Sequence, residues 1–262
     1  MRPILDQILR STRDRVDKAK KATDGADLRT RALQKLSVAR PHAFLTSIGQ
    51  PDGLTIIAEF KRASPSKGVI NDLADPSATA RSYELAGARA ISVLTEPHYF
   101  KGSVDDLRLI RSTVSIPILR KDFIIDEFQI YEAAEAGADA ILLIVGALNV
   151  DELRRFRSIA EEELGMDAVI EVHTVEEMEI AKEIDAKLIG VNNRNLQTFD
   201  VSLDVSRNLV AYAPVGAALV SESGLKNRDE LLELKCLGYS AFLIGETLMR
   251  TSGGVLSKEL LP

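Results

Sequence analysis

Short apolar runs that recur at a nearly constant spacing constrain the fold of this chain more than any other feature. Eight of them have the length and composition of a buried strand. They begin near residues 54, 90, 116, 139, 167, 187, 217 and 240, about 27 residues apart on average. Because they are apolar on both faces, they are typical of parallel strands that are covered from both sides.

Helical patterns fill the intervals between these runs. They span Pro76–Ala86, Val104–Thr113, Asp126–Ala136, Asn149–Leu164, Val175–Ile184, Leu203–Ala211 and Asn227–Leu237. Three of the joints are alike, since Gly87, Gly137 and Gly238 each follow a helix end and precede a buried run. Glycine in that place is typical of a left-handed helix cap. The alternation of strand and helix with short joints predicts a parallel sheet.

Eight such units predict an α/β fold, a (β/α)8 TIM barrel over residues 54–262. The alternative is an open doubly wound sheet, which usually carries a glycine-rich dinucleotide loop after its first strand. Here the first strand is followed by KRASPSKG, residues 61–68, which has no such glycine pattern. The unit count and this loop both favour the barrel.

Residues 1–53 precede the first strand and are predicted to be an N-terminal two-helix extension of the same domain. Residues 3–22 and 27–39 have helical patterns, and His42–Gly53 is predicted to be a loop. An apolar stripe formed by Ile4, Leu5, Ile8 and Leu9 is not needed to close the barrel, so it must pack on something. Two alternatives are a stabilising plug on the barrel and a partial lid over its strand-end rim, and the lid is the favoured hypothesis.

Composition excludes several classes of protein. The chain has 262 residues, enough for one large domain, and its net charge of −6 does not suggest a nucleic-acid-binding surface. No apolar run approaches the length of a bilayer span, and the charged N-terminus does not resemble a secretory signal. The single cysteine, Cys236, is predicted to be a buried, inert thiol. We expect a cytoplasmic protein with no membrane partner that is a monomer or a weak homodimer.

Polar residues follow six of the eight runs directly, and in a barrel these positions converge on one rim, where the chemistry lies. The group comprises Glu59, Lys61, Lys121, Glu171, Asn192, Arg194 and Glu222. Cations and carboxylates together indicate an anionic substrate and acid–base chemistry. Ser223, Gly224 and Gly245 lie where barrels often bind phosphate through backbone N–H groups, and Glu246 could contribute only its own N–H.

A metal site has little support in the sequence. Glu171 and His173 could supply two ligands, but alternate strand positions need not face the same site. The chain has only three histidines, without the spacing of a typical metal motif. We therefore predict that no metal is bound.

The strand-end segments resemble one family, indole-3-glycerol-phosphate synthase of tryptophan biosynthesis. The matching segments are IAEFKRASPSKG (57–68), SVLTEPHYFKGS (92–103), IPILRKDF (116–123), ADAILLIV (138–145), VIEVH (169–173), IGVNNRNL (189–196), SESG (221–224) and AFLIGETLM (241–249). The resemblance implies ring closure of 1-(o-carboxyphenylamino)-1-deoxyribulose 5-phosphate to indole-3-glycerol phosphate, CO2 and water, with no cofactor.

The resemblance also implies roles for individual residues. Lys121 resembles a general acid for the ketone oxygen, Glu171 a partner that orients or deprotonates near it, and Glu59 the base of the dehydration. Lys61 resembles either a ligand of the substrate carboxylate or the acid of the dehydration. Further matching positions imply contacts with the substrate: Asn192 and Arg194 with the intermediate and its carboxylate, Ser64 and Glu222 within the site, Ser223, Gly224 and Gly245 with phosphate, and Phe100, Phe123 and Leu142 with the aryl ring.

Two rival functions remain open at this point. One is a Schiff-base aldolase that uses Lys121 as its nucleophile. The other is a barrel that binds a phosphate ligand without catalysis, and such a barrel would not need the lysine–glutamate pairs.

Overall fold

Eight parallel strands close into a barrel in the computed structural model, which describes residues 3–36, 40–49, 53–195 and 198–250. The barrel strands are β1 (Ile56–Phe60), β4 (Ala90–Leu94), β5 (Ile118–Lys121), β6 (Ala140–Ile144), β7 (Asp167–Val172), β8 (Leu188–Asn192), β9 (Ala218–Glu222) and β10 (Ala241–Ile244). Neighbours in the chain are neighbours in the barrel, and β1 closes the ring by pairing with β10, Ile57 opposite Leu243. The (β/α)8 prediction is confirmed, since an open sheet would leave β1 and β10 as edges.

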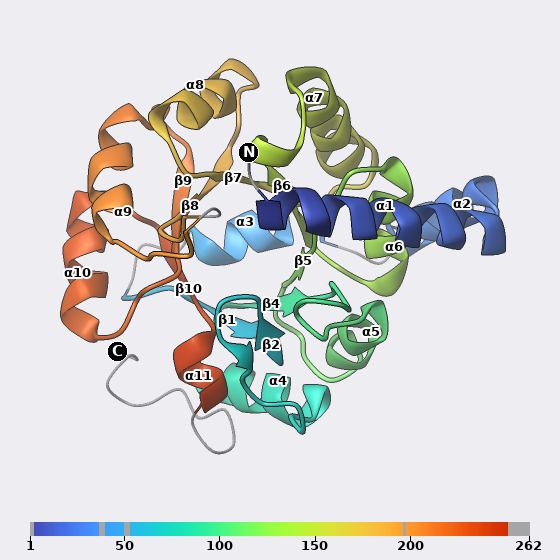
Figure 1. Cartoon of the computed structure of the whole chain (residues 1–262), viewed down its shortest axis with the longest axis horizontal. Coiled ribbons are helices and arrows are strands. Elements are labelled where there is room, and N and C mark those ends of the chain that lie inside the picture. Colours follow the sequence, from blue (N-terminus) through green and yellow to red (C-terminus); the bar gives the residue numbers. More distant parts are fainter. Residues whose placement is uncertain (1–2, 37–39, 50–52, 196–197, 251–262) are drawn as a thin grey trace.

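Helices connect successive strands on the outside of the barrel (Figure 1). They are α4 (Pro76–Leu85), α5 (Val104–Arg111), α6 (Glu127–Ala136), α7 (Val150–Ser158), α8 (Val175–Glu183), α9 (Asp204–Leu209) and α10 (Arg228–Leu237), and the short α11 (Glu246–Arg250) follows the last strand. Capping explains where several begin. Asn149 and Asn227 each accept a hydrogen bond from the third helical N–H in a reciprocal capping box, which satisfies donors that the helix leaves open. Short helical turns η1 (Val145–Ala147), η2 (Ile159–Glu163) and η3 (Val210–Tyr212) extend the connections.

The strand side chains divide between two apolar clusters. Outward residues such as Ile56 and Ile91 pack with the surrounding helices, whereas Ile57, Leu142 and Leu243 fill the inside of the barrel. Each large aliphatic side chain buried in this way contributes roughly 1.5–3 kcal/mol. Because strand side chains alternate, the inward position of Ile57 also directs Glu59 inward, as the sequence predicted.

The N-terminal segment reaches both ends of the barrel (Figure 1). Helix α1 (Pro3–Ala22) crosses the open end in the foreground, and α2 (Gly25–Leu36) packs against α6 on the outside. A third helix, α3 (Ala43–Ile48), lies where the sequence predicted only loop, so that part of the prediction is wrong. Phe44 and Ile48 are completely buried in the cluster inside the barrel. The helix forms because the barrel interior buries its apolar face. The segment is too short for its sequence pattern to predict a helix.

Asp167 and Arg89, at the starts of β7 and β4, fix α3 at the amino end of the strands. Asp167 accepts hydrogen bonds from the Leu45 N–H at 2.8 Å and from the His42 ring at 3.1 Å. The Ser47 hydroxyl donates to the Arg89 carbonyl at 2.6 Å. The extension therefore supplies a plug at one end of the barrel as well as a helix across the other.

The prediction that Cys236 is buried is wrong, because its side chain is exposed on α10. Leu231 and Leu234 form the buried stripe of that helix, and Cys236 lies off this stripe. The apolar neighbours in sequence therefore did not indicate burial at this position.

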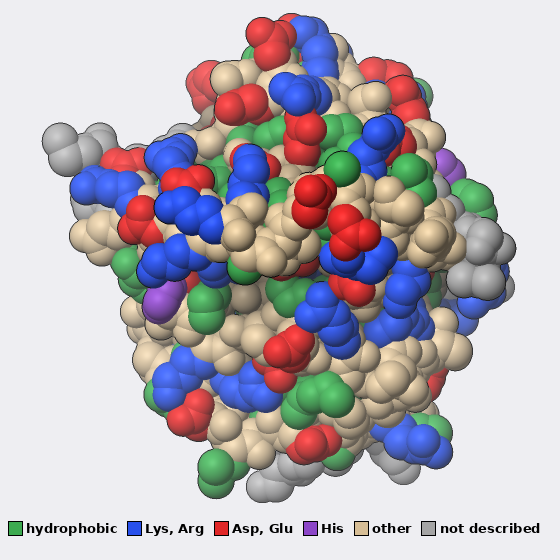
Figure 2. Space-filling view, turned by 90° about the vertical axis from the view of Figure 1, so that its right-hand side faces the viewer, with side chains coloured by type: hydrophobic (Ala, Val, Ile, Leu, Met, Phe, Trp, Pro, Cys, Tyr) green, Lys and Arg blue, Asp and Glu red, His purple; other side chains and the backbone are tan. Residues whose placement is uncertain are grey.

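The surface turned toward the viewer in Figure 2 carries basic and acidic side chains close together, with no broad area of one sign. None of the helices among the described residues is both long and apolar enough to cross a membrane.

Candidate active site

A cavity of about 1050 Å3 opens at the carboxyl ends of the barrel strands. Its walls bring together residues from all eight barrel strands or the loops that follow them. The predicted residues that line it are Glu59, Lys61, Ser64, Phe100, Lys121, Phe123, Leu142, Glu171, Asn192, Arg194, Ser223, Gly224, Gly245 and Glu246. Glu222 lies beneath them, completely buried, and contacts the site through Lys121.

Lys121, the last residue of β5, joins the carboxylates across the barrel. Its ammonium group forms an ion pair and hydrogen bond with Glu222 on β9 and lies 3.6 Å from the Glu59 carboxylate on β1. Glu59 in turn pairs with Lys61. The result is a chain of alternating charges, Glu222–Lys121–Glu59–Lys61, whose members come from three strands.

Burial and pairing act in opposite directions on the pKa values of these groups. Burial lowers the pKa of Lys121, but the charges of Glu222, Glu59 and Glu171 outweigh it, so the net pKa is raised and the lysine stays an ammonium. Burial raises the pKa of Glu59, but Lys61 and Lys121 reverse this effect and hold it below its ordinary range. For Glu222, burial dominates and raises the pKa to about 6. The site thus holds a protonated acid and an ionised carboxylate next to each other at neutral pH.

Two glycines make room for these carboxylates. A Cβ atom added at Gly190 on β8 would collide with the Glu222 carboxylate, and one at Gly245 would collide with that of Glu59. The sequence assigned Gly245 to phosphate binding alone and gave no role to Gly190. Both glycines therefore also leave the space that a carboxylate occupies, and any side chain at either position would fill that space.

The apolar part of the cavity lies between the barrel and α1. The rings of Phe100 and Phe123 are 6.1 Å apart between centroids and tilted by 39°, and Leu142 is almost completely buried beside them. Ile4, Leu5 and Ile8 of α1 line the same cavity. The stripe on α1 thus covers the strand-end rim, the position that the lid hypothesis requires.

The loop that carries Phe100 is held by Glu96. Its buried carboxylate accepts hydrogen bonds from the backbone N–H groups of His98, Tyr99 and Phe100, at 3.0, 2.6 and 3.1 Å. This charged acceptor fixes the loop, which explains why an acid follows β4.

The polar part of the cavity lies near the ends of β9 and β10. Ser223 and Gly224 both have left-handed backbone conformations, with φ of 67° and 81°, and line the cavity with Gly245. Arg194 lines the same cavity and donates a hydrogen bond to Ser66 at 3.2 Å, in the loop between the short strands β2 (Ala63–Ser64) and β3 (Gly68–Val69). Glu246 is balanced by Arg250 at 3.1 Å and by Lys67 at 3.9 Å. Backbone donors and cations together suit an anionic group.

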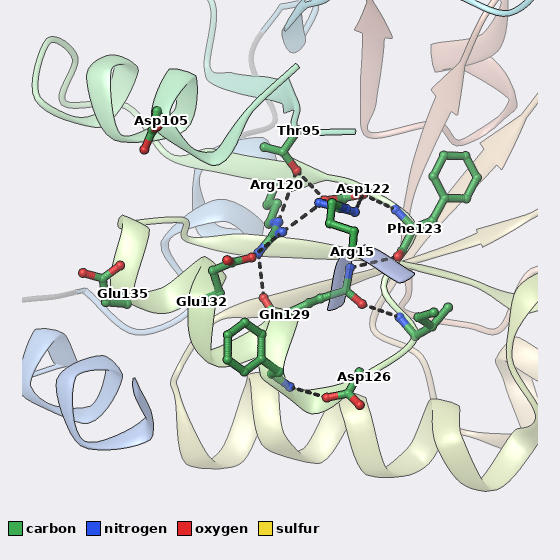
Figure 3. A network of polar contacts seen from close by, with 12 residues as sticks. Arg15, Thr95, Asp105, Arg120, Asp122, Phe123, Asp126, Gln129, Glu132 and Glu135 are labelled. Carbon is green, nitrogen blue, oxygen red and sulfur yellow. Dashed lines mark hydrogen bonds and ion pairs between the residues drawn. The ribbon is translucent and has the colours of Figure 1, made fainter. Parts of the chain in front are cut away.

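A buried ionic network beside Lys121 was missed by the sequence reasoning (Figure 3). Asp122 accepts two hydrogen bonds from Arg15 of α1, at 2.8 and 3.0 Å, and others from Thr95 at 2.7 Å and Arg120 at 3.1 Å. Arg120 is completely buried, points out of the barrel and also pairs with Glu132 at 2.8 Å. Arg15 gave no signal, because it is one of many charged residues in an amphipathic helix.

The described residues contain no cluster of three histidine, cysteine or acidic side chains that could hold a metal ion. The two ring nitrogens of His173 face different carboxylates, Glu177 at 3.2 Å and Glu171 at 3.5 Å.

Comparison with solved structures shows the fold. A mandelate oxidase variant matches with a TM-score of 0.59 and 18% identity over 79% of this chain and 71% of that one. N-acetylmannosamine-6-phosphate 2-epimerase from Clostridium perfringens matches with a TM-score of 0.57 and 17% identity over 81% and 93%. At such identities the likeness concerns the fold only.

Comparison with curated sequences shows the family as well as the fold. The family model described as indole-3-glycerol phosphate synthase matches residues 5–257. The indole-3-glycerol phosphate synthase of Ruminiclostridium cellulolyticum is 45% identical over 97% of this chain and 98% of its own length. That of Desulfotalea psychrophila is 46% identical, with the whole of both chains covered. Since the model and these relatives match almost end to end, the chain belongs to the indole-3-glycerol phosphate synthase family.

Proposed function

We propose that this cavity closes the indole ring of 1-(o-carboxyphenylamino)-1-deoxyribulose 5-phosphate, releasing CO2 and water and leaving indole-3-glycerol phosphate. Family membership supports this reaction, that of a decarboxylating lyase in tryptophan biosynthesis. The cavity supports it through its three parts, an apolar slot, a row of alternating charges and an anion-binding end. The substrate has an aryl ring, a ketone and a phosphate in the same order.

One observation carries the proposal: a lysine held as an ammonium between two carboxylates, at the middle of the cavity. In the condensation, a ring carbon attacks the ketone and negative charge develops on the ketone oxygen. Lys121 donates its proton to that oxygen, and the carboxyl group leaves as CO2, which restores the aromatic ring. Glu171 orients or deprotonates near the same centre.

The dehydration needs a base and an acid on the same intermediate. Glu59 is kept ionised by its two lysines and takes the proton, while the departing hydroxyl accepts one from a lysine. Lys61 supplies that proton or binds the substrate carboxylate, and Asn192 and Arg194 hold the intermediate. Glu222 stabilises the charged form of Lys121 from below.

Substrate binding divides between the two ends of the cavity. Phe100, Phe123 and Leu142 contact the aryl ring, with the stripe of α1 as a cover. Ser223, Gly224, Gly245 and the backbone N–H of Glu246 contact the phosphate, and Ser64 contacts the substrate within the site.

The charge of Lys121 argues against a Schiff-base aldolase. A nucleophilic lysine needs a neutral amine, and this is usually achieved by an apolar pocket or a neighbouring cation. Lys121 instead faces two carboxylates that keep it protonated. Borohydride with a carbonyl substrate should therefore trap no adduct on this lysine.

We also propose that the protein is cytoplasmic, is a monomer or weak homodimer, and folds with residues 1–53 as part of the barrel domain. The packing of α3 against the interior of the barrel supports a single domain for both parts. Light scattering after gel filtration measures the oligomeric state directly.

The direct test is addition of the substrate while indole fluorescence is followed. Rising fluorescence with release of one CO2 for each product supports the proposal. A protein that binds the substrate but never turns it over is instead a ligand-binding barrel.

The first prediction concerns Lys121→Met, which removes the proposed acid but keeps much of the side-chain volume. We expect kcat to fall by about 10²- to 10⁴-fold while a product-like phosphate still binds. Lys187→Met, in an exposed pair with Asp185 before β8, is the matched control and should behave as the parent. A Lys121→Met enzyme within a few-fold of the parent would contradict the assignment.

A further inference from the structure

His173 has a place in the structure that the proposed reaction does not use. It directly follows β7, two residues after Glu171, and its side chain is only 12% exposed. It does not line the main cavity but a second one of about 370 Å3, behind the ends of β7 and β8. A buried, titratable ring next to a candidate catalytic carboxylate requires an explanation.

Glu177, in the first turn of α8, fixes the orientation of the ring. One of its carboxylate oxygens lies 3.2 Å from His173 Nδ1 and accepts the His173 backbone N–H at 2.7 Å. Glu177 is in turn held by its own N–H, which donates to the Thr174 hydroxyl at 3.2 Å. Because an ionised carboxylate can only accept, the Nδ1 atom carries the proton in this contact.

The other ring nitrogen faces Glu171. His173 Nε2 is buried and lies 3.5 Å from Glu171 Oε1, and no described residue forms a hydrogen bond with it. With Nδ1 already protonated, Nε2 can donate toward Glu171 only when the ring is an imidazolium. A neutral ring would instead direct a lone pair at a carboxylate.

The charges around the ring favour the imidazolium. Burial lowers the pKa of His173, but Glu177, Glu171 and Glu222 outweigh this and raise it above its ordinary value. Of the other charged groups near the ring, Arg194 and Asp200 line the same second cavity, from the segment after β8, and have opposite signs. The ring thus lies among carboxylates from β7, α8 and β9.

We propose that His173, as an imidazolium clamped by Glu177, is a positioning residue that keeps the Glu171 carboxylate aimed into the cavity. This inference rests on the proposed role of Glu171. His173 acts through that carboxylate and does not touch the substrate.

The test uses the full chain with His173→Leu, His173→Gln and Glu171→Gln, and His98→Leu at an exposed histidine of the rim as the matched control. His173→Leu should lower kcat about 10- to 100-fold with little change in KM, as expected when an acting group loses its orientation. His173→Gln restores a hydrogen-bond donor toward Glu171 without a charge and should recover part of the lost kcat.

Three results separate this inference from a structural role and from failure of the proposed function. If His173→Leu lowers the melting temperature but leaves kcat as in the parent, the positioning role is refuted. If Glu171→Gln keeps the parent kcat, the proposed role of Glu171 is wrong, and the inference about His173 is wrong with it. Glu171→Gln with His173→Leu should lose no more kcat than Glu171→Gln alone, and additive losses would overturn the inference.

A measurement independent of activity is the 15N spectrum of labelled histidine. The chain has only three histidines, so His173 can be assigned by its variants. The ring should be an imidazolium at pH 7 in the parent and should lose its proton at lower pH in Glu171→Gln. A neutral ring in the parent at pH 7 counts against the proposal.

Discussion

Glu222 is a carboxylate held out of contact with water. It is completely buried, one of its oxygens pairs with Lys121, and the other has no hydrogen-bond partner among the described residues. Burial therefore raises its pKa to about 6 in spite of the lysine.

This pKa predicts an acid limb in the activity. As pH falls through about 6, Glu222 takes up a proton and no longer offers Lys121 a charged partner, so kcat should fall. Glu222→Gln cannot titrate, so it should be slower than the parent at pH 7.5 and should lack this inflection. The measurement is the pH profile of kcat for both proteins. An unchanged inflection in Glu222→Gln would mean that another group causes the acid limb.

Gly190 acts at the same residue scale, through the space it leaves. Gly190→Ala places a methyl group where the Glu222 carboxylate lies, so Glu222 and Lys121 must shift. A displacement of about 1 Å in a catalytic group can cost about 10²-fold in rate. We expect a large loss of kcat in Gly190→Ala, with indole fluorescence as the readout. Gly25→Ala, at the start of α2 where a Cβ meets nothing within 4 Å, is the matched control, and equal kcat in both variants would contradict the spacer role.

At the scale of elements, the ion pair of Arg15 couples α1 to the site. Arg15 spans from α1 to Asp122, which follows Lys121 and also binds the Phe123 N–H at 2.8 Å (Figure 3). The same carboxylate thus positions the helix over the cavity and the backbone between the lysine and the aryl pocket.

Removing this link should affect both stability and substrate binding. Arg15→Ala leaves Asp122 with Thr95 and Arg120, and the loss of charged hydrogen bonds should cost about 1–3 kcal/mol in the free energy of unfolding. We also expect KM to rise several-fold, because α1 is held less firmly over the apolar slot. Arg10→Ala, an exposed residue of the same helix, serves as the control. Parent-like KM in Arg15→Ala would mean that α1 stays in place without this pair.

At the scale of the whole molecule, the N-terminal extension has two separate tasks. Helix α1 covers the carboxyl end of the barrel, and α3 fills its amino end with Phe44 and Ile48. A lid and a plug were alternatives from the sequence, yet the structure contains an element in each position.

Deletion of residues 1–40 removes α1 and α2 and leaves α3 in place. We expect substrate affinity and turnover to suffer more than the melting temperature, since the apolar slot loses one wall. Phe44→Ala tests the opposite case, because it weakens the packing of α3 and leaves α1 in place. It should cost about 3–5 kcal/mol of stability while KM stays near the parent value. Steady-state kinetics and thermal unfolding of both proteins separate the tasks. Normal kinetics with a large loss of stability in the truncated chain would assign the plug to α1 and α2.

The sequence by itself determined the structural features that depend only on neighbours along the chain. Strand alternation placed Ile57, Glu59 and Lys61 on one face, and glycines after helices predicted the caps at Gly137 and Gly238. Eight repeats of these local patterns were enough for the barrel, because each unit can bury its faces only beside the next. Polar residues at the strand ends then indicated the rim at which the cavity opens.

Only the tertiary structure decided which of these charges face one another. Lys121 and Glu222 are 101 residues apart, and their ion pair depends on barrel closure and strand register, which alternation does not encode. The same holds for Arg15 with Asp122, for the space at Gly190 and for the two carboxylates that hold His173. Local patterns show which side of an element a residue occupies, but the partner, distance and ionisation of its side chain are set when distant elements meet.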